Sequence, residues 1–199
     1  IKEGVASAIE TSLPHDGSVE LTVVQFSDTA RVAIPPTVIT EANYQTIADT
    51  VRGLTQQGGE TAMAAGLNAT WWAMKNSPNF EATAKQIINV ATDGMPNVPL
   101  NTTASTGDPA EDVILVRNLA AIEGLDEIDA EAIGVPQIEW MRENLTLPQP
   151  GHIAPPYTPG WVYQVPDASA FADAIATKFE LLTEVKGRYE WVVVGRDAA

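Results

Sequence analysis

The stretch QIINVATDG, residues 86–94, decides the fold class of this chain. Most of it is an apolar run without polar alternation, which is typical of a strand buried on both faces of a parallel sheet. The run stops at Thr92-Asp93-Gly94, so an acidic side chain stands at the carboxyl end of the predicted strand. Because such a strand needs helices on both faces of its sheet, the flanking sequence must supply them.

The flanking sequence alternates between segments typical of helices and segments typical of strands. Apolar residues at helical spacing, together with caps at Asp108 and Asp167, predict helices at residues 1–10, 41–54, 63–74, 108–122, 138–145 and 167–182. Strands are predicted at residues 19–26, 30–34, 86–92, 128–135, 161–165 and 189–195. This order predicts an α/β fold of three layers: a doubly wound, mostly parallel, Rossmann-like sheet with helices on both faces and one antiparallel edge hairpin.

Composition narrows the class of protein. The chain has 199 residues, 45% of them hydrophobic, which suits one globular domain. Its 11 basic and 26 acidic side chains give a net charge of −15, which would repel a phosphate backbone, so we expect no nucleic-acid partner. It has no cysteine, which excludes thiol catalysis and cysteine-ligated metals. No apolar run approaches the roughly 20 residues of a membrane helix, so we expect no membrane insertion by these residues.

Two polar side chains are placed where open α/β sheets bind ligands, beyond the carboxyl ends of the strands. Thr61 lies in the glycine loop GGETAM (58–63), which opens a predicted helix, and Asp93 ends the predicted strand 86–92. A hydroxyl and a carboxylate on one rim are hard oxygen donors suited to Mg²⁺, but two donors alone would bind it weakly. The alternative roles are a helix cap for Thr61 and a turn into Gly94 for Asp93.

The order of helix, VELTVVQFSDTARV (19–32), GGETAMAAGL (58–67) and IINVATDG (87–94) resembles a von Willebrand factor type A domain over roughly residues 1–183. The resemblance implies a metal-ion-dependent adhesion site on the rim. Thr61 and Asp93 match two of the family's metal ligands, and Gly59, Glu60 and Gly94 would line the ligand-binding rim. It also implies Mg²⁺, or Mn²⁺ or Ca²⁺, as cofactor, and a protein partner whose carboxylate completes the coordination.

One family motif is missing from these residues. The family's first strand ends in Asp-x-Ser-x-Ser, which supplies further metal ligands, and this pattern occurs nowhere in the sequence. Because that strand lies in the middle of the family's sheet, its loss would leave buried backbone groups unpaired, each costing about 1–3 kcal/mol. Three explanations are open: the sequence is part of a longer protein, a cleaved upstream piece stays bound, or another strand occupies the slot.

The segment YEWVVVGRD (189–197) is the candidate for that slot, in cis or by exchange between copies. It is strongly β-prone and ends in Asp197, but Ala198 and Ala199 would stand where the family has hydroxyls. Alternatively, it begins a further domain. We therefore divide the chain into an N-terminally incomplete type A domain, residues 1–187, and a C-terminal strand, residues 188–199.

These observations predict a non-enzymatic, metal-dependent adhesion or protein-binding module at the cell surface or outside the cell. The alternative is a structural subunit of a surface assembly without a functional metal site, which could include other copies of the chain. An enzyme built on Asp93 is disfavoured because no His, Lys or second carboxylate falls at another recognisable strand end. Asp28 is expected to be a turn residue, Trp72 to be partly exposed and able to contact a partner, and loops 95–107 and 146–160 to shape the rim.

Overall fold

The computed structural model of the chain describes residues 1–153, 158–183 and 189–195. The helices are α1 (Lys2–Thr11), α2 (Tyr44–Arg52), α3 (Met63–Lys75), α4 (Pro109–Ile122), α5 (Ile138–Trp140), which continues into a π-helical turn (Met141–Leu145), and α6 (Phe171–Thr183). The strands are β1 (Asp16–Phe26), β2 (Ala30–Thr40), β3 (Lys85–Thr92), β4 (Glu127–Ile133), β5 (Val162–Val165) and β6 (Tyr189–Gly195).

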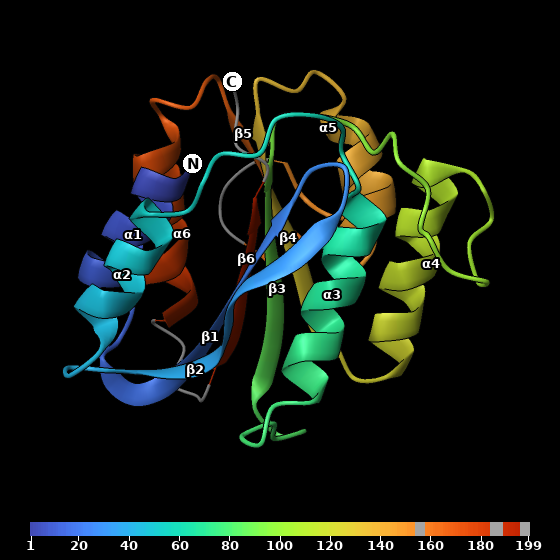
Figure 1. The fold of residues 1–199 in the computed structure, drawn as a ribbon. Helices are drawn as coiled ribbons and strands as arrows, with labels where there is room; N and C mark the ends of the chain where they lie inside the picture. The colour runs from blue at the N-terminus through green and yellow to red at the C-terminus, as the bar shows by residue number, and fades with distance from the viewer. Residues whose placement is uncertain (154–157, 184–188, 196–199) are drawn as a thin grey trace.

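The strands form one six-stranded sheet in the order β2-β1-β6-β3-β4-β5. Among the strands that the structure describes, only β2 runs antiparallel, as the outer strand of a hairpin with β1, and the other neighbours are parallel. Figure 1 shows α1, α2 and α6 on one side of the sheet and α3 and α4 on the other. The predicted fold class is confirmed, including the hairpin at one edge.

The central strand comes from the end of the sequence. All of β6, from Tyr189 to Gly195, pairs in parallel with residues 19–25 of β1 and with residues 85–91 of β3. This slot belongs to the first strand in the family that the sequence resembles. The pairing satisfies the backbone groups of β1 and β3 that would otherwise be buried without partners. Asp197, Ala198 and Ala199 lie outside the described residues.

The core lies in two layers, one on each face of the sheet. Apolar residues of α1, α2 and α6 pack on one face, with Ile9, Ile47 and Phe171 among those fully or almost fully buried. On the other face, α3 and α4 pack through residues that include Leu67 and Val113. Burial on both faces is the reason why β3 lacks a polar alternation.

Two residues show how local sequence positions the helices. Asp108 caps α4 by accepting hydrogen bonds from the amides of Ala110 (2.8 Å) and Glu111 (3.1 Å), as its place before Pro109 predicts. Gly4 allows α1 to approach α6, because a Cβ atom at that position would lie 2.8 Å from the ring of Phe171.

The expectation for loop 146–160 is wrong for its described residues. Leu147 forms an antiparallel bridge with Ile128, and the amides of Gly160 and Trp161 donate to the side chain of Asp129. These contacts hold the loop against the amino-terminal half of β4, away from the carboxyl rim. The place of the loop depends on contacts with β4, a strand distant in the sequence, which no local pattern indicates.

Candidate functional site: the carboxyl rim of the sheet

The rim is built where β1 and β3 end on either side of β6. Ser27 and Asp28 follow β1, and Asp93 follows β3. Because neighbouring strands lie about 4.8 Å apart, the ends of β1 and β3 are separated by roughly 10 Å. The strand order reverses between them, which is where open α/β sheets bind their ligands.

The glycine loop spans this interval. At one end, the amide of Ala62 donates to the carbonyl of Ser27 at 2.7 Å. Beside it, the amide of Thr61 donates to Asn97 Oδ1 at 2.6 Å, and the amide of Asn97 donates to the carbonyl of Thr61 at 3.2 Å. The loop is therefore attached both to the end of β1 and to the segment that follows Asp93. No local sequence pattern indicates a role for Asn97, because it stands 36 positions after Thr61 in the chain.

The exposed part of the loop is held by Asp28. Its Oδ1 accepts a hydrogen bond from the amide of Glu60 at 2.7 Å. Gly59 has φ +120°, and a Cβ atom there would lie 2.2 Å from the same oxygen. Only glycine combines this backbone conformation with so close an approach. Asp28 thus lies in the turn between β1 and β2, as predicted, and also positions the predicted rim residues Gly59 and Glu60.

Asp93 and Gly94 lie in a short turn closed by the preceding residue. Thr92 Oγ1 donates to the carbonyl of Gly94 at 3.0 Å and accepts from the amide of Gly94 at 3.2 Å. Asp93 is half-buried, whereas Thr61 is only 1% exposed. The loop attachment and this turn bring the segments that carry the two predicted metal ligands to the same rim.

The oxygen donors at the rim are of the kind that binds a divalent cation, but there are few of them. The hydroxyl of Thr61 and the carboxylate of Asp93 are oxygen donors of the type that Mg²⁺ prefers, and Mg²⁺ takes about six oxygens, several of them water. Within residues 1–153, 158–183 and 189–195, no three His, Cys, Asp or Glu side chains are grouped so that they could hold a metal ion. These residues alone would hold a cation weakly.

Comparison with known proteins finds a family match over part of the chain. Residues 1–95 match the model of the von Willebrand factor type A domain. The predicted resemblance to this family is confirmed. The matched part contains the glycine loop with Thr61 and the strand that leads to Asp93. No curated protein matches the chain.

Two solved structures resemble this type A fold. The crystal structure of the conserved hypothetical protein BatB from Bacteroides thetaiotaomicron has a TM-score of 0.55 and 15% identity, covering 92% of this chain and 86% of that chain. The crystal structure of an aerotolerance-related membrane protein from Bacteroides fragilis has a TM-score of 0.48 and 13% identity, covering 98% of this chain and 79% of that chain. The first likeness shows a shared fold.

The match to this family indicates a general kind of function. Von Willebrand factor type A domains are generally protein-interaction modules. Among the helices that the structure describes, none is both long enough and apolar enough to cross a membrane.

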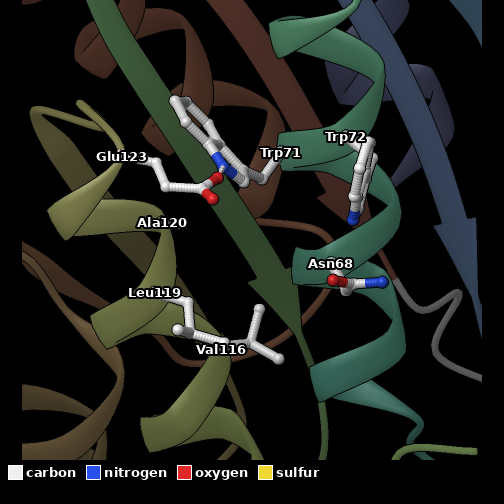
Figure 2. A pocket seen from close by; sticks show the side chains of 7 residues that line it. All are labelled: Asn68, Trp71, Trp72, Val116, Leu119, Ala120 and Glu123. Carbon is white, nitrogen blue, oxygen red and sulfur yellow. Dashed lines mark hydrogen bonds between the residues drawn. The ribbon is translucent and has the colours of Figure 1, made fainter. Parts of the chain in front are cut away.

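A second surface feature lies away from the rim, between α3 and α4 (Figure 2). A shallow hollow of about 160 Å³ is lined by Asn68, Trp71, Trp72, Val116, Leu119, Ala120 and Glu123. Trp71 is buried and donates from Nε1 to Glu123 Oε2 at 2.8 Å, whereas Trp72 is 59% exposed. The predicted exposure of Trp72 is confirmed, and its contact with a partner stays a prediction.

Proposed function

We propose that this domain is a non-enzymatic adhesion or protein-binding module whose binding face is the carboxyl rim of the sheet. The family supports the class of function. The observation that supports the place is the loop of residues 58–62, which is hydrogen-bonded to Ser27 on one side and to Asn97 on the other. Just before these attachments the loop presents Gly59 and Glu60 to solvent.

The finer part of the proposal concerns a cation. Thr61 and Asp93 would contribute a hydroxyl and a carboxylate to Mg²⁺, Mn²⁺ or Ca²⁺, and Asp28 would keep the loop in place. When bound, the cation would supply a coordination position for a carboxylate of a protein partner. The net charge of −15 makes a bridging cation useful, since an acidic partner would otherwise be repelled. This mode of binding suits a protein at the cell surface or outside the cell.

A second candidate is a structural subunit of a surface assembly that uses no cation. The position of β6 favours it. The family slot that would carry the Asp-x-Ser-x-Ser strand is occupied from Tyr189 to Gly195, and no residue of β6 is an aspartate or a serine. In this candidate, the rim and the surface around Trp72 would pack against other subunits, which could include further copies of the chain.

Thermal unfolding distinguishes the candidates. The protein is melted in EDTA and then with millimolar Mg²⁺ or Mn²⁺, alongside Thr61→Ala, Asp93→Ala and the control Asp49→Asn, which changes an exposed carboxylate on α2. A cation at 100 times its Kd adds about 2.7 kcal/mol, a shift of several degrees. A shift that persists in Asp49→Asn and is lost in both rim variants supports the adhesion site. No shift in the unaltered protein contradicts it and favours the structural subunit.

A further inference from the structure

A cluster of charged side chains is buried between β4 and α6, on the face of the sheet opposite to α3 and α4. Glu127, Asp129 and Glu131 alternate along β4 and therefore point to the same face. All three are 0% exposed, as is Lys178 of α6. Charged side chains are almost never fully buried unless they are paired, so this grouping needs a physical account.

Two of the three carboxylates have a close cation. Lys178 Nζ lies 2.8 Å from Glu131 Oε1, and Asn89 of β3 donates from Nδ2 to Glu131 Oε2 at 2.6 Å. Lys85, at the start of β3, forms an ion pair with Glu127. The ammonium of Lys178 is 3.7 Å from Asp129 Oδ2, beyond the usual length of a direct hydrogen bond.

Asp129 instead connects β4 with the segment that enters β5. Its Oδ1 accepts hydrogen bonds from the amides of Gly160 at 3.0 Å and Trp161 at 2.7 Å. The ring of Trp161 lies over the ammonium of Lys178, with 5.9 Å between the ring centre and Nζ. The cluster therefore joins four elements: β3, β4, the entry to β5, and α6.

The charges in this cluster do not balance when every group is ionised. The three carboxylates carry −3 and the ammonium groups of Lys85 and Lys178 carry +2. An uncompensated buried charge costs several kcal/mol, and a carboxyl group in that position takes up a proton instead. One proton makes the cluster neutral.

Asp129 is the carboxyl group best placed to take that proton. Glu131 and Glu127 each have a closer ammonium partner, whereas Oδ2 of Asp129 does not. Burial raises the pKa of Asp129 well above its ordinary value; Lys178 opposes this effect, and the neighbouring Glu127 adds to it. A proton on Oδ2 would be donated to Glu127, while Oδ1 keeps the two backbone amides as donors.

We propose that Asp129 is a buried proton-binding site, which holds one proton at neutral pH and whose ionisation at alkaline pH loosens α6 and the entry to β5 from β4. The groups that face it are Glu127 and Glu131 on β4, Lys178 on α6, Lys85 on β3 through Glu127, and Tyr163 on β5, whose ring packs against Trp161. Ionisation would leave the cluster with one uncompensated negative charge.

The sign of the pH dependence follows from linkage. A carboxyl group with a raised pKa in the folded state favours folding when it is protonated, and this contribution is lost as the pH rises through that pKa. The carboxyl groups with lowered pKa values, such as Asp112 and Glu10, act at the acid end of the range. The pH range between the ordinary aspartate pKa and the raised pKa of Asp129 therefore reports on Asp129.

The test is urea unfolding from pH 5 to pH 9 of the unaltered protein, Asp129→Asn and the control Asp173→Asn, an exposed residue of α6. Asparagine has the shape of a protonated aspartate and cannot ionise. We expect the unfolding constant of the unaltered protein, relative to Asp129→Asn, to rise with pH by up to tenfold per unit below the folded-state pKa of Asp129, and to level off above that pKa. Asp173→Asn should follow the unaltered protein. A ratio that stays constant across this range contradicts the proposal.

A second measurement keeps the proposal testable if Asp129→Asn does not fold. Carbon-13 spectroscopy of the aspartate carboxyl groups in the unaltered protein should show one that titrates above pH 7, together with a loss of amide protection at Gly160 and Trp161 after correction for intrinsic exchange. If every aspartate carboxyl titrates near pH 4, Asp129 holds no proton at neutral pH and the proposal is overturned.

Discussion

Asn97 and Thr61 are joined by two hydrogen bonds, one between their backbones and one in which the side chain of Asn97 is the acceptor. The amide of Thr61 donates to Asn97 Oδ1 at 2.6 Å, and the amide of Asn97 donates to the carbonyl of Thr61 at 3.2 Å. Thr61 comes from the glycine loop, and Asn97 follows the strand that ends near Asp93. This pair fixes the distance between the two halves of the rim.

Asn97→Ala should loosen the rim. It removes the acceptor of the Thr61 amide, which we expect to lower the free energy of unfolding by about 1 kcal/mol. Asn101→Ala, in the same loop and exposed, is the matched control and should stay within about 0.5 kcal/mol of the unaltered protein. Urea unfolding followed by circular dichroism measures both, and equal effects would show that the Asn97 side chain holds nothing.

Gly59→Ala should disturb the loop more than Gly58→Ala. At Gly59 the backbone is in the left-handed region, and a Cβ atom would push aside the carboxylate of Asp28, so we expect a loss of about 2 kcal/mol. At Gly58 no heavy atom lies within 4 Å of an added Cβ atom. Adding Asp28→Ala to Gly59→Ala should restore part of the loss by relieving the clash. Additive effects in this cycle of variants would argue against the contact.

Asp112→Asn should destabilise the loop that precedes α4 in a pH-dependent way. The buried carboxylate of Asp112 accepts from the amide of Leu100, from Ser105 Oγ, and from the amide and hydroxyl of Thr106. Burial raises the pKa of Asp112, but the hydrogen bonds from Ser105, Thr106 and Leu100 outweigh it and lower the pKa overall.

A lowered pKa means that Asp112 stabilises the fold above its unfolded pKa, and that this contribution is lost as the pH falls through the folded pKa. We expect Asp112→Asn to cost about 2 kcal/mol at pH 7 and progressively less below about pH 4. Glu111→Gln, on the same helical turn, is the control. The readout is the free energy of unfolding from urea curves at pH 3 to pH 7, and a cost independent of pH would count against the ionised carboxylate.

Substitutions of the two adjacent tryptophans of α3 should have different effects on the stability of the fold. Trp71→Ala removes a side chain that is 4% exposed and bonded to Glu123, and should cost about 3–5 kcal/mol. Trp72→Ala removes one that is 59% exposed and should change stability by less than about 0.5 kcal/mol. Denaturant unfolding gives both values. A large loss for Trp72→Ala would mean that this side chain supports the fold rather than presenting a free surface.

Local patterns in the sequence predicted most of the elements and the fold class. The cap at Asp108 is an example of success, because the Asp-Pro-Ala-Glu order acts over a single helical turn. The buried cluster is an example of failure. Residues 127–133 alternate acidic and apolar side chains, which is typical of a half-exposed strand, yet all seven residues are buried. One feature of the sequence does indicate a buried charge on α6. Lys178 stands at the helical spacing of the apolar side chains that are buried there, namely Phe171, Ala174, Ile175 and Phe179.

The sequence by itself determined which segments are strands and helices, that the sheet is mostly parallel, and that Thr61 and Asp93 follow elements ending at a rim. Those properties depend on periodicity and capping over a few residues. Only the tertiary structure decided that β6 lies between β1 and β3, that Asn97 holds Thr61, and that Lys178 meets Glu131. These contacts join residues far apart in the chain, and they form because buried backbone amides and charges must find partners wherever the fold brings them together.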